Sequence, residues 1–183
     1  MDATLRCIAR WGVAKTTLDD VARQAGCSRA TVYRMVPGGK DGLMELVCRV
    51  EGARFFAGIA ERLDGAEDLE SLLVLGIAEA GRRIRDHSAL GYLLAYEPER
   101  IVPRLAFRRL DEVLTAAAEF AEPWLARWLP EPGEAARAAE WITRLVLSYS
   151  ACPADGVDIG DEQSVRRLVR TYVLPGLQVP IQR

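Results

Sequence analysis

The sequence predicts an all-α protein, and three observations support this fold class. Apolar residues recur at spacings of three and four positions, as in Leu43, Leu46, Val47 and Val50, which is the period of one helix face. Strand signals are nearly absent, because no run alternates β-branched or aromatic residues with polar ones. Glycines and prolines also divide the chain into segments of helical length.

These helix breakers set the ends of about nine expected helices. They are, in order along the chain, Gly12, Gly26, Pro37-Gly38-Gly39, Asp64-Gly65, residues 86–88, Glu97-Pro98, Pro103, Pro123, Pro130 to Gly133, and Pro153 to Gly160. The expected helices cover residues 3–11, 17–24, 28–35, 40–63, 67–86, 88–96, 103–128 with a break at Pro123, 134–151 and 162–174.

Composition favours a globular protein without a membrane span. Half of the residues are hydrophobic and 27% are charged, which is ordinary for such a protein. No apolar run approaches the ~18 to 20 residues that a membrane helix needs, and the N-terminus carries charge where a signal peptide has an apolar core. We therefore expect a cytoplasmic protein that has no membrane partner.

The cysteines and the single histidine do not form a recognisable metal-binding pattern. Cys7, Cys27, Cys48 and Cys152 are scattered without C-x-x-C spacing, and His87 has no candidate ligand nearby in the sequence. We expect no metal, no cofactor and no disulfide, with the cysteines acting as small buried hydrophobic residues. A redox-sensing Cys27 is the alternative.

Charge is distributed unevenly between the two ends of the chain. Residues 1–40 hold seven basic and three acidic side chains, a net charge of +4, whereas the remaining 17 basic and 23 acidic side chains give −6. The N-terminal part is therefore suited to an anionic partner such as nucleic acid, even though the whole chain has a net charge of −2.

The stretch TTLDDVARQAGCSRATVYRMV, residues 16–36, contains the signals of two short helices around one glycine. Thr16 or Thr17 with the aspartates three positions on predicts a capped start. Gly26 favours the left-handed conformation that ends a helix, and Ser28 is a strong N-cap for the next one. The expected inward-facing residues are Leu18, Val21, Ala22 and Ala25 in the first helix, and Val32, Met35 and Val36 in the second.

The spacing of Ala22, Gly26 and Val32 is that of a helix-turn-helix. Such a motif needs a small residue where the helices cross, a glycine in the turn and an apolar residue between the helices. No acidic residue lies between Ser28 and Lys40, and a carboxylate there would be repelled by DNA phosphates. The outward face of the second helix can therefore enter a DNA groove, where arginine can contact guanine and threonine or alanine methyls can contact thymine. A surface helix that is basic by accident is the alternative.

The stretch RWGVAKTTLDDVARQAGCSRATVYRMVPGGKDGLMELV resembles the N-terminal DNA-binding domain of the TetR family of bacterial transcriptional regulators. The resemblance implies phosphate contacts by Thr17, Tyr33 and Lys40, and positions near base edges for Arg29, Ala30, Thr31 and Arg34. The sequence departs from the family pattern in one extra residue before Lys40 and in Val36, where an aromatic residue is usual. The expected DNA-binding residues are Thr17, Ser28, Arg29, Ala30, Thr31, Tyr33, Arg34 and Lys40.

The remaining helices are expected to pair two subunits and to bind an effector. We expect a helix-turn-helix domain over residues 1–45 and a ligand-binding and dimerisation domain over residues 46–183. In the TetR family the last two helices form a four-helix bundle with those of a second subunit. The expected interface residues are Ala138, Ile142, Leu145, Val165, Leu168, Val169 and Tyr172, although the same pattern also fits an intramolecular core.

Aromatic residues gather in the C-terminal half, where a pocket between helices is a common ligand site. The family resemblance implies an inducer, and the residue types favour an apolar or aromatic one. The expected pocket residues are Ile77, Tyr92, Tyr96, Phe107, Leu110, Trp124, Trp128, Trp141, Leu145 and Tyr149, with an ordinary core as the alternative.

Together these features predict a ligand-responsive regulator, most simply a repressor that binds a palindromic operator as a homodimer. An enzyme is not favoured, because one histidine and no catalytic motif leave the usual parts missing. The other alternative is a helical protein that binds small molecules or partners and no longer reads DNA.

Overall fold

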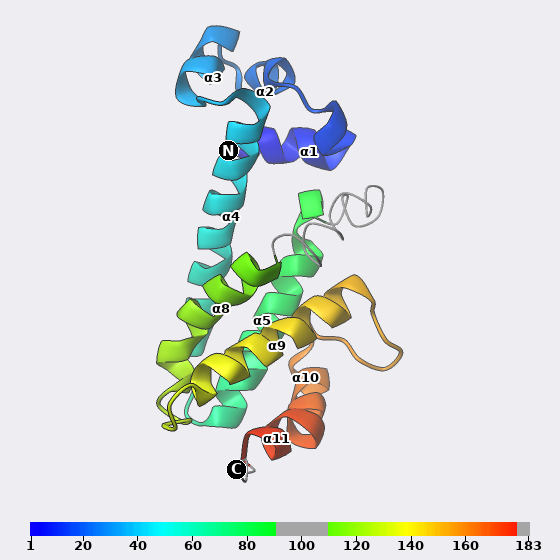
Figure 1. Ribbon diagram of the computed structural model, residues 1–183. Coiled ribbons are helices and arrows are strands. Elements are labelled where there is room, and N and C mark those ends of the chain that lie inside the picture. The colour runs from blue at the N-terminus through cyan, green and yellow to red at the C-terminus, as the bar shows by residue number, and fades with distance from the viewer. Residues whose placement is uncertain (91–109, 179–183) are drawn as a thin grey trace. The chain divides into compact units, whose positions relative to one another are not determined.

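The computed structural model describes residues 1–90 and 110–178, and it confirms the all-α fold class (Figure 1). These described residues contain no strand, only an isolated bridge between Ala154 and Val157. They divide between two compact units, the first with residues 1–55 and 86–90, the second with residues 56–85 and 110–178. None of the described helices has the length and hydropathy to cross a bilayer.

The first unit begins with four helices, which are α1 (Asp2–Lys15), α2 (Leu18–Ala25), α3 (Arg29–Met35) and the N-terminal part of α4 (Gly39–Leu63). α1 is kinked at Gly12, whose φ of 77° lies in the left-handed region that glycine tolerates. The expected interruption at this glycine is therefore real, but a further helical turn follows it to Lys15. Thr16 then closes that turn by donating its hydroxyl to the Gly12 carbonyl at 2.7 Å.

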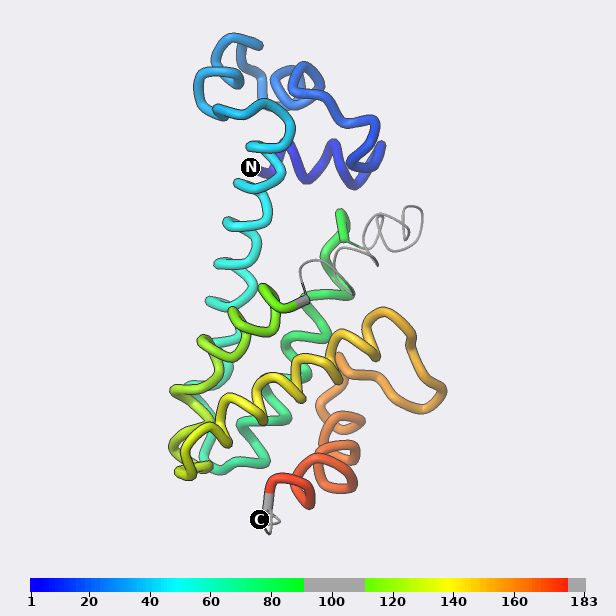
Figure 2. The backbone as a smooth tube through the Cα atoms, in the orientation of Figure 1, coloured from blue at the N-terminus to red at the C-terminus, as the bar shows by residue number. Residues whose placement is uncertain are grey.

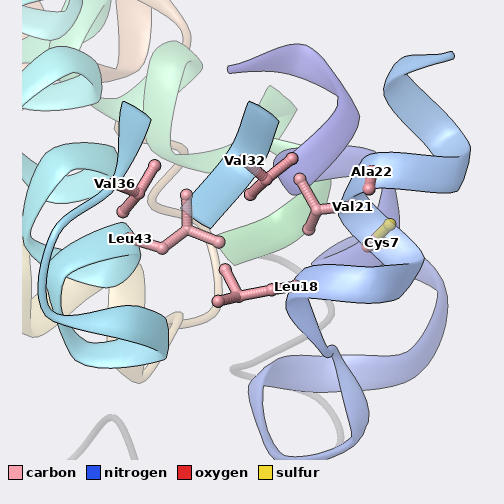
Figure 3. Close-up of a cluster of buried hydrophobic side chains, with 7 residues drawn as sticks. All are labelled: Cys7, Leu18, Val21, Ala22, Val32, Val36 and Leu43. Carbon is pink, nitrogen blue, oxygen red and sulfur yellow. The ribbon is translucent and has the colours of Figure 1, made fainter. Parts of the chain in front are cut away.

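One small cluster of apolar side chains holds α1, α2, α3 and α4 together (Figure 3). Leu43 of α4 lies among Leu18, Val32 and Val36, so that three helices share one buried side chain. The buried members of the cluster are Cys7, Leu18, Val21, Ala22, Val32, Val36 and Leu43. Val36 occupies a core position with only 8% exposure, which shows how this chain fills the place where the family commonly has an aromatic residue.

The second unit contains the C-terminal part of α4 and the helices α5 (Leu69–Asp86), α8 (Leu110–Leu125), α9 (Glu134–Ala151), α10 (Glu162–Leu168) and α11 (Leu174–Gln178). A π-helical turn, η2 (Val169–Val173), connects α10 to α11. α8 leads into a turn, and α9 returns along it (Figure 2). The buried side of α5 is apolar, and Val74 and Ile77 on it are almost completely buried.

Two expected helices in this unit differ in regularity from the prediction. α8 continues through Pro123 and ends two residues later at Leu125, although an interior proline lacks an N–H donor and crowds the carbonyl four residues before it. The expected helix over residues 162–174 is not regular, since the N–H of Leu174 bonds to the Val169 carbonyl five residues back. Pro175, which has no N–H to donate, follows this π turn.

The structure corrects part of the expected dimer face. Ala138, Val165, Leu168 and Val169 are each at most 6% exposed within a single chain, so they offer a partner almost no surface and form core instead. Of the other expected interface residues, Ile142 and Leu145 are half-buried and Tyr172 is 71% exposed.

The expected pocket residues have different environments in one chain. Tyr92, Tyr96 and Phe107 lie outside the described residues, and Leu110 is the first residue of α8. Ile77 is 1% exposed, whereas Trp141 is 44% exposed and is therefore not enclosed within one chain. The remaining four, Trp124, Trp128, Leu145 and Tyr149, are half-buried.

The four cysteines are free, but only Cys7 is buried. Burial raises the pKa of the Cys7 thiol, with the charge of Asp20 acting in the same direction. Cys27, Cys48 and Cys152 are exposed, which corrects the expectation that all four are buried hydrophobic residues.

Candidate nucleic-acid interface

The start of α2 is fixed by a reciprocal capping box between Thr17 and Asp20. The Thr17 hydroxyl accepts the Asp20 backbone N–H at 3.2 Å, and an Asp20 carboxylate oxygen accepts the Thr17 backbone N–H at 3.1 Å. The Thr17 hydroxyl also donates to the same carboxylate at 2.5 Å. These hydrogen bonds, that of the Thr17 hydroxyl first, lower the pKa of the Asp20 carboxyl below its ordinary value.

The turn between α2 and α3 depends on Gly26 and Ser28. Gly26 has φ 67° and ψ 29°, the left-handed conformation expected at the end of α2. The Ser28 hydroxyl then accepts the Thr31 backbone N–H at 3.1 Å and lies 2.8 Å from the Thr31 hydroxyl. The turn therefore fixes where α3 begins, and with it the direction in which the outward face of α3 points.

Fewer residues of α2 and α3 face the core than the sequence pattern predicts. Ala22 and Val32 are 4% and 7% exposed and lie in the same cluster as Val36, as the helix-turn-helix spacing requires. Met35 is 71% exposed and Ala25 is exposed as well. Both expected inward positions are thus wrong, whereas Val36, which directly follows α3, is buried as expected.

The outward face of α3 combines apolar, aromatic and basic side chains. Ala30 and Arg34 are exposed, and Tyr33 and Met35 are 47% and 71% exposed. Among the residues that the structure describes, none forms an ion pair with Arg34. These side chains are therefore available to a partner, and they include Met35, which the sequence pattern placed in the core.

Arg29, at the first position of α3, already has partners within the chain. Its Nε lies 2.8 Å from Oδ1 of Asp19 in α2, and its guanidinium carbon lies 5.5 Å from the centroid of the Tyr33 ring. A hydrogen bond with Tyr33 and the nearby charge of Asp19 raise the pKa of the Arg29 guanidinium. Sequence reasoning missed Asp19, because nothing in a one-dimensional pattern pairs the start of α2 with the start of α3.

Lys40, for which the family resemblance implies a phosphate contact, has a hydrogen-bond partner within the chain. Its Nζ donates to the Ala14 carbonyl at 2.9 Å, so it connects the start of α4 to the end of α1. The segment before it reverses through Gly38 and Gly39, whose φ values are 91° and 64°. Gly42 is also required, since a Cβ there would lie 2.2 Å from the Pro37 carbonyl oxygen. The extra glycine before Lys40 is thus accommodated in a glycine-dependent turn.

The eight expected DNA-binding residues therefore fall into two sets. Ala30, Tyr33 and Arg34 share the exposed outer surface of α3, where the Tyr33 ring also lies against Arg29. Thr17, Ser28, Arg29, Thr31 and Lys40 each make polar contacts within the chain. Groups of three or more His, Cys, Asp or Glu side chains that could hold a metal ion do not occur within residues 1–90 or 110–178.

Comparison with known proteins agrees with this geometry. A family model described as bacterial regulatory proteins, tetR family, matches residues 1–47. An HTH-type transcriptional regulator of Mycobacterium tuberculosis is 30% identical over 177 residues, which cover 96% of this chain and 82% of the relative.

Two solved structures resemble the whole chain. One is the TetR family repressor AlkX from a Dietzia strain, implicated in biodegradation of n-alkanes, with a TM-score of 0.70 and 25% identity over 97% of this chain and 94% of that one. The other is the fatty acid degradation regulator FadR from Bacillus halodurans, with a TM-score of 0.67 and 17% identity over 92% of this chain and 90% of that one. The second likeness concerns the fold alone.

Proposed function

This chain belongs to the TetR family of bacterial regulatory proteins, which are transcriptional regulators and not enzymes, and from this membership we propose that it is a ligand-responsive repressor. In this proposal the protein binds a palindromic operator as a homodimer, with residues 1–45 as its DNA-binding domain. An apolar or aromatic small molecule releases it. A regulator of this kind acts on bacterial DNA, and we accordingly place it in the cytoplasm.

The observation that carries the proposal is the exposed outer surface of α3. Ala30, Tyr33, Arg34 and Met35 are exposed together, and no acidic side chain occurs between Ser28 and Lys40. In a helix-turn-helix the second helix enters the major groove with its N-terminal residues against base edges. A surface that carries positive charge and no carboxylate is suited to the phosphate-lined major groove.

We assign base recognition to the two arginines and to the small side chains between them. Arg34 and Arg29 would each form paired hydrogen bonds with the O6 and N7 atoms of a guanine. Ala30, the Thr31 methyl and Met35 would contact thymine methyl groups. Arg34 is available as it stands, whereas Arg29 reaches a base while keeping or exchanging its contact with Asp19.

Phosphate contacts would come from residues at the edges of the motif. The Tyr33 hydroxyl is the clearest donor, because its side chain is 47% exposed. Thr17 and Ser28 lie at helix N-termini, where backbone N–H groups also favour anions. Lys40 donates to the Ala14 carbonyl, and its positive charge would attract phosphates from there. We therefore assign it two roles, holding the start of α4 against the end of α1 and contacting a phosphate.

A homodimer would form through the exposed residues of the C-terminal helices. Trp141 of α9 and Tyr172 of η2 are 44% and 71% exposed, and large aromatic side chains are typical anchors of protein interfaces. Ile142 and Leu145 contribute the half-buried part of this surface. The twofold symmetry of such a dimer matches the symmetry of a palindromic operator.

An apolar effector is supported by one comparison and by the composition of the second unit. The structural relative AlkX is implicated in biodegradation of n-alkanes. Ile77, Trp124, Trp128 and Tyr149 would line a site in this unit. The ligand would shift the DNA-binding equilibrium only by its different affinity for the DNA-bound and released states.

Selection of bound duplexes from a random DNA pool, at two salt concentrations, tests the proposal. We expect enrichment of a palindrome and affinity that falls as salt rises, because phosphate contacts release counterions. Addition of n-alkanes of increasing length should then lower affinity for the selected duplex. No enrichment by a protein with a helical circular dichroism spectrum would contradict DNA reading and favour a helical binding protein that recognises other partners.

A further inference from the structure

The Asp19 side chain lies beside the first turn of α3, although it belongs to α2. Its Oδ1 atom is 2.8 Å from Nε of Arg29. The side chain as a whole is 41% exposed, yet Oδ1 itself is shielded from solvent and accepts no well-aligned hydrogen bond from the described residues. This oxygen therefore interacts with the charge of Arg29 and not with water.

Arg29 is held on two sides by these contacts. Asp19 approaches its Nε, and the Tyr33 ring lies 5.5 Å from its guanidinium carbon, within the range of a cation–π contact. An arginine can bind guanine O6 and N7 through its two terminal nitrogens, and neither of these is the atom that Asp19 approaches. The arginine can therefore keep its carboxylate partner while it contacts a base.

The two neighbouring aspartates have different roles. Asp20 is committed to the capping box of α2 through Thr17. The Asp19 carboxylate is instead directed across to α3. A carboxylate close to DNA phosphates lowers affinity for every sequence, so a contact that orients Arg29 is a physical reason for placing one here.

We propose that Asp19 is a specificity-determining residue, which positions Arg29 for recognition of one base pair in each half-site. A long arginine side chain loses conformational entropy when it docks. The contacts with Asp19 and Tyr33 reduce that cost for one orientation of the guanidinium. Asp19 thus lowers general affinity for DNA and raises discrimination at the base that Arg29 contacts. This inference rests on the proposed function of α3.

The test compares two charge-removing variants of the same unit. Asp19→Asn removes the carboxylate beside Arg29 with little change in size. Asp41→Asn is the matched control, since Asp41 is an exposed carboxylate in the first turn of α4. Affinities are measured for the selected operator, for its single-base variants and for an unrelated duplex. Arg29→Ala identifies the base pair at which preference depends on Arg29.

We expect both asparagine variants to bind the unrelated duplex more tightly than the wild-type protein. Only Asp19→Asn should reduce discrimination at the Arg29-dependent base pair, by about two- to five-fold for an exposed ion pair. Asp19→Glu should retain part of that discrimination, because it keeps a carboxylate. If Asp19→Asn unfolds in circular dichroism melting, Asp19→Gln compared with Asp19→Glu provides the same test.

Several outcomes would overturn the inference. If Asp19→Asn and Asp41→Asn have the same relative affinities for the single-base variants, Asp19 only repels DNA phosphates and does not position Arg29. If Asp19→Asn discriminates more strongly at the Arg29-dependent base pair than the wild-type protein, Asp19 hinders the contact of Arg29 with DNA. If Arg29→Ala and the wild-type protein have the same relative affinities for the single-base variants, Arg29 does not recognise a base. If the wild-type protein itself shows no sequence preference, the proposed function fails, and the inference fails with it.

Discussion

In the second unit most of the described arginines pair with carboxylates, whereas on α3 one of the two arginines has no carboxylate partner among the described residues. Glu70 accepts hydrogen bonds from Arg166 at 2.7 Å and from Arg170 at 3.0 Å, and these bonds, that of Arg170 first, lower the pKa of the Glu70 carboxyl. On α3, Arg29 has one carboxylate partner. Arg34 has none among the residues that the structure describes.

This contrast indicates that arginine serves two purposes in the chain, the pairing of helices and the binding of DNA. The pairs of Glu70 connect α5 to α10 and η2, so these arginines hold helices together. Arg34 has no such partner and stays hydrated, and it can exchange that water for phosphates or guanine. Substitutions in the second unit should therefore alter stability with little effect on DNA recognition, whereas substitutions on α3 should alter DNA recognition.

The largest effect is expected from truncation of a core side chain in the first unit. Leu43→Ala should lower the free energy of unfolding by about 2–5 kcal/mol, because Leu43 packs against α2 and α3 (Figure 3). DNA affinity should fall with it, since α3 loses its support. Leu73→Ala, a similar truncation at a 3% exposed position of α5, should cost similar stability.

Urea unfolding and binding titrations under conditions in which both variants remain folded provide the comparison. Leu73→Ala should keep close to wild-type affinity for the selected operator, whereas Leu43→Ala should not. Equal losses of DNA binding in the two variants would show that the two units do not separate these roles.

The next effect concerns one paired and one unpaired arginine. Arg34→Ala should lose about 1–3 kcal/mol of discrimination at a single base pair of each half-site. Arg144→Ala removes an exposed arginine that is paired with Glu140 at 2.7 Å. It should change stability by no more than about 0.5 kcal/mol and leave the base profile unchanged. An Arg34→Ala variant that weakens all sequences equally would make Arg34 a phosphate contact.

A smaller and uniform effect is expected from Tyr33. Tyr33→Phe retains the ring that lies near Arg29 and removes the hydroxyl, together with its hydrogen bond to Arg29. Affinity for all duplexes should fall by about 0.5–1.5 kcal/mol, the value of one hydrogen bond. Unchanged affinity for all duplexes with Tyr33→Phe would argue against a phosphate contact.

The smallest effect is a shared dependence of stability on acid pH. Hydrogen bonds lower the pKa of Asp20, chiefly through Thr17, and that of Asp68, chiefly through the Ser71 backbone N–H. Both folded-state pKa values lie below the ordinary value of 3.8, so ionised carboxylates favour the folded state. This stabilisation is complete above the ordinary value and is lost as pH falls through the folded-state values.

Urea unfolding at neutral and acid pH measures this contribution. Asp20→Asn and Asp68→Asn should each reduce the difference in stability between the two pH values. If both variants keep the full wild-type pH dependence, the caps are not its source, and other carboxylates such as Glu70 would account for it.

Local signals allowed the sequence to predict the helix-turn-helix closely. The capping box at Thr17, the left-handed turn at Gly26 and the N-cap at Ser28 each depend on a few neighbouring residues. Ala22 and Val32 then follow from helix periodicity and the crossing of the two helices. The prediction for Met35 is wrong, because periodicity near a helix end does not show which of two adjacent apolar residues is buried, and here Val36 is buried and Met35 is exposed.

Contacts between distant residues could not be predicted in this way. The Arg29–Asp19 pair and the Lys40 bond to Ala14 depend on how helices are placed in three dimensions. Val165 and Val169 show the same limit, since an apolar stripe fits a core and an interface equally well and only their burial separates the two.

Methylation protection of the selected operator by dimethyl sulfate tests the central proposal most directly. The reagent modifies guanine N7 in the major groove and adenine N3 in the minor groove, so it reports which groove α3 occupies. The wild-type protein should protect guanine N7 in two symmetry-related half-sites, and Arg34→Ala should lose protection at one guanine in each. Protection confined to adenine N3, or guanine protection unchanged by Arg34→Ala, would contradict recognition of the major groove by α3.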